Sequence, residues 1–180
     1  MCYLVDTYGK SCQLGASRRR WEDALALHSC KRWAGAIYLG GYAIECSLKS
    51  LICDEEGKLN FKDTSLYQKG LQGASLHSLA KLRSGSHRLE RSISLDRTGT
   101  YKKAWNTVAE LWRNDELRYS DKLGNEAEST KFIEAVKKLH QLLLINQGGI
   151  RDRYSSATST DSKSSAARVT KPRYTGKNIC

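Results

Sequence analysis

The sequence has 180 residues, with 30 Lys and Arg against 19 Asp and Glu, and therefore a formal net charge of +11. A hydrophobic content of 39% is enough for one domain of ordinary size, and a single proline beside 14 glycines excludes collagen-like and proline-rich chains. The longest uncharged apolar stretch, residues 33–44, is shorter than the ~20 residues of a membrane-spanning helix. Because the first residues also lack a basic leader and an apolar run, we expect no membrane association and a cytoplasmic location.

Apolar residues recur at intervals of three and four residues through most of the chain, a spacing that predicts amphipathic helices. We predict helices over residues 18–31, 32–53, 77–89, 101–112 and 126–147. Ser17 stands where its hydroxyl can accept a hydrogen bond from the first free N–H groups, so we expect it to cap the first helix. Residues 54–74 show no clear period and are expected to form a connecting loop with at most one short turn.

Several glycines lie within or at the ends of these predicted helices. Gly40 and Gly41 lie in the middle of the second helix, where each costs about 1 kcal/mol relative to alanine. We interpret the pair as a place where another backbone approaches closely. Gly85 weakens the second half of the third helix, and Gly148 with Gly149 ends the last one. Since no strand pattern competes, the predicted fold class is all-α, a bundle of four or five helices with a basic C-terminal tail.

The charge divides the chain into segments. We predict an N-terminal extension (1–16), a helical domain (17–147) and a basic tail rich in Ser and Thr (148–180). Residues 151–180 hold seven basic and two acidic residues and carry +5 of the net charge, which leaves +6 for the rest. They offer almost nothing apolar to bury, so we expect this segment to be disordered when alone and to contact a polyanion. The alternative is a solubilising segment without a ligand.

Clusters of basic residues on the helical domain are predicted to act together with the tail. Gathered on one face, they would attract nucleic acid through their summed field; the alternative is that they are simply solvated. The predicted nucleic-acid contacts are Arg18, Arg19, Arg20, Lys102 and Lys103 on the helices and Arg151, Arg153, Lys163, Arg168, Lys171, Arg173 and Lys177 in the tail.

Common motifs for nucleotide and hydrolase chemistry are missing, including the phosphate-binding G-x-x-x-x-G-K-Ser/Thr loop and the G-x-S-x-G nucleophile elbow. The six cysteines form no C-x-x-C pair and have no histidine at a zinc-ligand spacing. We therefore predict free thiols, no metal and no cofactor, with a disulfide or metal role as the alternative. Metal-independent RNA cleavage needs a histidine and a cation, and His87 beside Arg83 is the best local candidate.

The stretch 32–51 resembles the second helix of HEPN-domain proteins, a superfamily of helical bundles. Its core, Y-x-G-G-Y-A-I-E-x-x-L-K, contains the motif residues Tyr38, Gly40, Gly41, Tyr42, Glu45 and Lys49. Three further features follow in the family's order: a His-x-Leu start at His77, a W…LRY segment that ends in Arg118 and Tyr119, and a closing helix over 127–144. The resemblance covers residues 17–147.

This resemblance implies a four- or five-helix bundle, frequently dimeric, often encoded beside a minimal nucleotidyltransferase or within prokaryotic defence and toxin–antitoxin systems. Active members of the family are metal-independent ribonucleases that carry Arg, four to six residues, then His. The sequence departs from that pattern, because three residues separate Arg83 from His87 and seven separate Arg20 from His28. Glu45 matches a polar residue of the family's second helix; the alternative is a carboxylate satisfied by a neighbouring helix.

We therefore predict a non-catalytic HEPN-like protein that binds RNA, or an RNA-containing complex, together with a protein partner, and that forms a homo-oligomer such as a dimer. One alternative is a metal-independent ribonuclease toxin with a non-standard site around Arg83 and His87. The other is a purely structural subunit of a larger complex.

Overall fold

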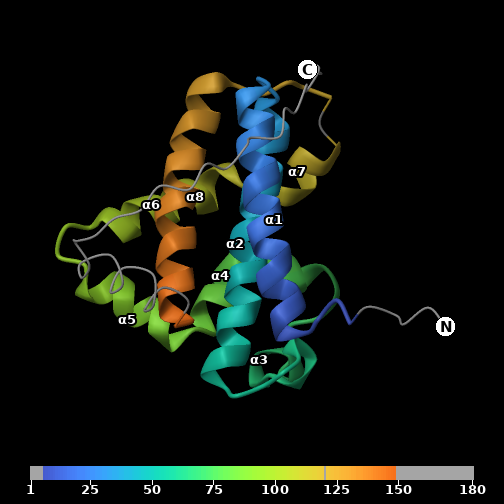
Figure 1. The fold of residues 1–180 in the computed structure, drawn as a ribbon, viewed down its shortest axis with the longest axis vertical. Coiled ribbons are helices and arrows are strands. Elements are labelled where there is room, and N and C mark those ends of the chain that lie inside the picture. Colours follow the sequence, from blue (N-terminus) through green and yellow to red (C-terminus); the bar gives the residue numbers. More distant parts are fainter. Residues whose placement is uncertain (1–5, 120, 149–180) are drawn as a thin grey trace, which may run out of the picture.

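The computed structural model describes residues 6–119 and 121–148 (Figure 1). Within these residues the chain forms helices and no strand, which confirms the predicted all-α class. The α-helices are α1 (Lys10–Ser29), α2 (Trp33–Glu55), α3 (Ser65–Gln68), α4 (Leu79–Ser84), α5 (His87–Leu95), α6 (Thr100–Leu111), α7 (Asn114–Tyr119) and α8 (Glu126–Asn146), and the 3₁₀ helices are η1 (Phe61–Asp63) and η2 (Gly73–His77). No helix of the described residues is long and apolar enough to cross a membrane.

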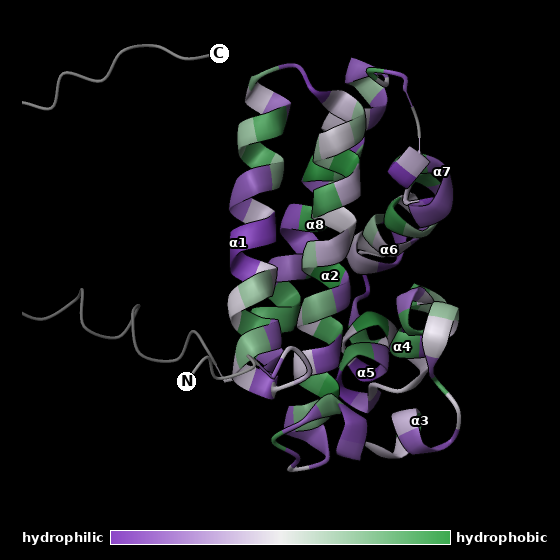
Figure 2. Cartoon of the chain, turned by 90° about the vertical axis from the view of Figure 1, so that its right-hand side faces the viewer, coloured by the Kyte–Doolittle hydropathy of each residue, from purple (hydrophilic) through white to green (hydrophobic). Residues whose placement is uncertain are grey.

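Helix α2 is the centre of the bundle. It packs against both α1 and α8, and these three long helices run alongside one another (Figure 1). Its buried side chains Ile44, Leu48 and Leu51 meet those of α8, such as Phe132 and Val136, in one continuous core. Helix α6 packs on α8, while α4 and α7 contact α2, so that α4 and α7 lie beside the same helix (Figure 2).

The glycine pair of α2 makes room for aromatic rings. A Cβ added to Gly41 would lie 2.0 Å from the indole of Trp112, and one added to Gly40 would lie 2.9 Å from the ring of Phe132. Both glycines are buried. The prediction that a second backbone approaches here is therefore wrong: two side chains, from the end of α6 and from α8, occupy the space.

Helix α1 begins at Lys10, eight residues before the predicted start. Ser17 lies inside the helix and is buried, so the predicted N-cap is wrong. Its hydroxyl donates to the carbonyl of Ala43 at 2.8 Å and also contacts Ser47 Oγ and His140 Nε2, each at 2.8 Å. A serine hydroxyl can cap a helix or bond to a neighbouring helix. Here the contacts of Ser17 with α2 and α8 give it the second role.

Some of the other predicted helix boundaries agree with the structure and some do not. Helices α6 and α8 lie within one residue of the predicted ranges. The predicted helix 77–89 is instead broken at Gly85, where Ser86 caps α5 by accepting from the Leu89 N–H, so its weak second half is a separate helix. The predicted loop 54–74 contains η1, α3 and the start of η2, and its Phe61 side chain is buried. Helix α7 was not predicted.

Candidate functional site

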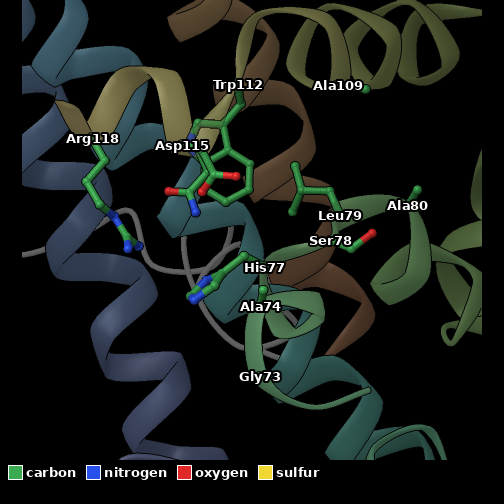
Figure 3. A pocket seen from close by; sticks show the side chains of 11 residues that line it. Gly73, Ala74, His77, Ser78, Leu79, Ala80, Ala109, Trp112, Asp115 and Arg118 are labelled. Carbon is green, nitrogen blue, oxygen red and sulfur yellow. The ribbon is translucent and has the colours of Figure 1, made fainter. Parts of the chain in front are cut away.

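A pocket of about 500 Å³ opens where η2 and the start of α4 face the end of α6 and α7 (Figure 3). Its walls combine small apolar residues with a few polar side chains, a composition typical of small-molecule sites. The residues that line it are Gly73, Ala74, His77, Ser78, Leu79, Ala80, Ala109, Trp112, Asn114, Asp115 and Arg118.

A buried carboxylate fixes the histidine of this pocket. Glu45 on α2 is only 2% exposed, and its Oε2 lies 3.0 Å from Nδ1 of His77. Since an ionised carboxylate can only accept, the Nδ1 atom carries the hydrogen of this bond. His77, which is about a third exposed, therefore turns its Nε2 edge away from Glu45.

The charge of Glu45 is balanced by Lys49, one turn further along α2. The Lys49 ammonium donates to Oε1 of Glu45, and both side chains are almost completely buried. Burying a charge without a partner is costly, and in this pair each side chain is the counter-ion of the other. The ammonium also lies 5.8 Å from the centre of the Phe61 ring, which borders it on the other side.

Tyr42 connects the histidine to the arginine of the pocket. Its ring packs edge to face with His77, at 5.8 Å between centroids, and its hydroxyl accepts a 2.8 Å hydrogen bond from Arg118 Nη2. The same hydroxyl donates to Asn114 Oδ1 at 2.9 Å. Burial is the main cause that raises the pKa of Tyr42 to about 12, so the phenol keeps the proton that it donates.

Trp112 forms the inner wall of the site. Its ring contacts that of Tyr42 at 5.3 Å between centroids, and its Nε1 donates to the carbonyl of Tyr38 at 3.1 Å. This indole is the group that fills the space above Gly41. Tyr38, Gly41 and Tyr42 of α2 are therefore arranged around one aromatic side chain that the pocket and the core share.

The structure brings together most of the residues on which the predicted resemblance rests. Tyr42, Glu45, Lys49, His77 and Arg118 are joined by hydrogen bonds, ion pairs or ring contacts, although they come from α2, η2 and α7. Tyr119, which follows Arg118, is 81% exposed. Asp115 lines the pocket and was not predicted, because its helix α7 shows no pattern in the sequence.

The predicted catalytic pair has other partners. Arg83 forms an ion pair with Glu90 and places its guanidinium 5.0 Å from the centre of the Trp105 ring. His87 is exposed, and its backbone N–H donates to Glu55 at 2.9 Å. It lines a separate cavity of about 560 Å³ that Arg83 does not line.

The predicted basic contacts lie on two helices. Arg18, Arg19 and Arg20 are exposed in the middle of α1, in a strongly hydrophilic part of that helix (Figure 2), and Arg20 lies 3.8 Å from Asp23. Lys102 and Lys103 are exposed on α6. The predicted tail contacts, Arg151, Arg153, Lys163, Arg168, Lys171, Arg173 and Lys177, lie outside the described residues.

A second, shallower groove of about 320 Å³ lies between α1 and α8. Arg18, Lys137 and the half-buried Trp21 line it, together with Glu22, His140, Gln141 and Leu144. Lys137 was not predicted as a nucleic-acid contact. Its only basic neighbour in the sequence is Lys138, and the surrounding helix holds both acidic and basic residues. Only the packing of α8 beside α1 reveals it as a neighbour of the groove.

His140 is the buried edge of that groove. Because the Ser17 hydroxyl donates its only hydrogen to Ala43, the 2.8 Å contact of Ser17 with His140 has Nε2–H as the donor. Burial and the nearby charge of Arg18 lower the pKa of His140 to about 4. The imidazole is therefore neutral at neutral pH and serves as a hydrogen-bond donor between α1 and α8.

Two observations concern relatives and metals. Comparison of the chain with protein-family models, with curated proteins and with solved structures gives no match. Across residues 6–119 and 121–148, no three His, Cys, Asp or Glu side chains come together as metal ligands.

Proposed function

We propose that this chain is a HEPN-like helical protein that binds RNA and a protein partner, with RNA lying on the surface formed by α1 and α8. The observation that carries the proposal is the groove that Arg18, Lys137 and the aromatic Trp21 line together. Cations that hold phosphates beside an aromatic ring that stacks on a base are the usual elements of single-strand binding.

The net charge outside residues 151–180 supports the same proposal. Residues outside the 151–180 segment carry +6, and Arg18 and Lys137 are both exposed where they line the groove. Each phosphate that a basic side chain neutralises releases condensed counterions, so such a surface binds RNA without reading its sequence. The protein partner, a second copy of the chain or a nucleotidyltransferase, and a role in a prokaryotic defence or toxin–antitoxin system belong to the proposal through the HEPN resemblance.

The test is RNA affinity measured against salt concentration by fluorescence anisotropy, with the full chain and a 5′-hydroxyl oligoribonucleotide. The double variant Arg18→Glu with Lys137→Glu should bind at least about tenfold more weakly and show a shallower salt dependence. The matched control is Lys58→Glu with Lys69→Glu, two exposed lysines that do not line the groove. Equal losses in the two double variants would contradict binding at this surface.

Metal-independent RNA cleavage is the second candidate function, and one observation favours it. His77 is held by Glu45 in the same pocket as Arg118, so an acid–base group and a cation line one space. RNA incubated with the protein and a chelator tests this function. Cleavage lost in His77→Ala would place the reaction here, cleavage lost in His87→Ala would place it at the other histidine, and intact RNA would exclude it.

The structural-subunit alternative has a simple readout. Purification of the full chain without bound nucleic acid, together with one stoichiometric protein, would favour it over RNA binding. RNA that copurifies and is released by salt would favour the leading proposal.

A further inference from the structure

We propose that the pocket between His77 and Arg118 binds a phosphate monoester, either free or at the end of an RNA strand. The pocket is separate from the groove between α1 and α8, and none of its lining residues is shared with that groove. The inference therefore concerns a second site, with its own ligand chemistry.

Two side chains that suit a phosphate face the same space. Figure 3 shows the guanidinium of Arg118 and the ring of His77 directed toward one another from α7 and the end of η2. A guanidinium presents a planar fork of N–H donors that matches phosphate oxygens in pairs. The Nε2 edge of His77 supplies a second, separate contact: in the neutral tautomer it accepts the hydrogen of a protonated phosphate oxygen, and in the imidazolium form it donates to a phosphate oxygen.

The supporting residues hold these two groups in place before a ligand arrives. Glu45 fixes the ring of His77 through the 3.0 Å bond to Nδ1, and Tyr42 holds Arg118 through the 2.8 Å bond to Nη2. Groups that are already oriented lose little conformational freedom on binding. The pocket is preorganised for an anion because Arg118 and His77 are both anchored on side chains of α2.

The buried charges do not oppose an incoming anion. Glu45 carries a negative charge next to His77, but the ammonium of Lys49 contacts it directly and neutralises it within the core. Asp115 is different, because it is exposed and lines the pocket. The Asp115 carboxylate repels inorganic phosphate. A phosphate ester whose organic part carries hydroxyl groups can instead donate a hydrogen bond to this carboxylate.

The remaining walls fit the organic part of such an ester. Leu79, Ala80 and Ala109 are apolar, and the indole of Trp112 closes the inner side. A volume of about 500 Å³ lies within the range of small-molecule sites and is enough for a sugar phosphate or the terminal nucleotide of a strand.

NMR titration of the full chain tests the proposal. Inorganic phosphate and ribose 5-phosphate should each shift the ring signals of His77, with the ester binding more tightly. Arg118→Gln should weaken both ligands by about tenfold or more, whereas the control Arg113→Gln, which removes an exposed arginine that pairs with Glu116 and lines a different cavity, should leave both unchanged. Absence of a shift at His77, or equal effects of the two variants, would overturn the proposal.

The source of the phosphate is decided with two oligoribonucleotides of identical sequence, one with a 5′-phosphate and one with a 5′-hydroxyl end. Tighter binding of the phosphorylated strand, lost in Arg118→Gln, assigns the pocket to RNA ends. Equal binding of the two strands, with ribose 5-phosphate still bound, assigns it to a free ester. The 5′-hydroxyl strand reports RNA binding outside the pocket, so failure of that binding and failure of the phosphate site are seen separately.

Discussion

The carboxylate of Glu45 and the imidazole of His77, 32 residues apart in the chain, meet at 3.0 Å, and the carboxylate is the buried partner. Its second oxygen is taken by Lys49, so one side chain of α2 joins a core cation to a pocket residue. This arrangement makes the site sensitive to changes inside the core.

Removal of the Glu45 charge should destabilise the fold strongly. In Glu45→Gln the Lys49 ammonium is left buried without a counter-ion, which typically costs about 3–5 kcal/mol of unfolding free energy. Urea denaturation of the full chain measures the loss. The double variant Glu45→Gln with Lys49→Met should regain much of it, because no unpaired charge remains, and a double variant as unstable as the single one would contradict this explanation.

Stability should fall with acidity through His140. The unfolded histidine takes up a proton near pH 6.5, while the folded one, with its pKa lowered to about 4, does not, so stability is complete above pH 6.5 and declines between 6.5 and 4. The decline due to this residue is about 3 kcal/mol. Chemical denaturation from pH 4 to 7 should show a flatter profile for His140→Gln, which cannot take up that proton. Parallel profiles for the two proteins would rule out this role.

Two glycines should respond to alanine in opposite directions. Gly41→Ala places a methyl group 2.0 Å from the Trp112 ring and should destabilise the fold by several kcal/mol, because the indole must move out of the core. Gly15 lies in α1, where an added Cβ would have the flexible side chain of Arg19 as its nearest neighbour, at 3.6 Å, so Gly15→Ala should stabilise the fold by up to about 1 kcal/mol. Thermal unfolding of both variants compares them, and a stable Gly41→Ala would show that the ring relocates freely.

Deletion of residues 151–180 should weaken RNA binding and reduce its salt dependence, because seven basic residues are removed. Anisotropy titrations at several salt concentrations measure both effects. A full-length variant with serine at those seven positions separates charge from length, since it should match the deletion. RNA binding unchanged in both would assign the affinity to the helical domain.

The sequence predicted the fold class and the long helices because their apolar spacing is regular. Helix α8, with Phe132 and Val136 on its buried face, shows this most clearly. Short helices such as α7 were missed because six residues are too few to show a period. The start of α1 was placed too late because Ser17 resembles a cap, and only its bonds to α2 and α8 reveal a buried residue.

The site was predictable in part. The motif residues Glu45, His77 and Arg118 were identified through the HEPN resemblance, and the structure gathers them at one pocket. Proximity in the sequence was a poor guide for Arg83 and His87, whose side chains have different surroundings. Residues that act through tertiary packing, such as Lys137 beside Trp21, carry no sequence signal of their own.

Trp112 gives the pocket a direct connection to the stability of the whole fold. Trp112 is 6% exposed, and its ring both lines the pocket and fills the space above Gly41. A ligand that contacts this ring therefore also stabilises the packing of the core. A ligand that binds only the folded chain raises its melting temperature in proportion to the logarithm of its concentration over its Kd. Thermal-shift screening of small phosphate esters, with indole fluorescence as a second signal, can therefore search for the occupant without any assay of activity.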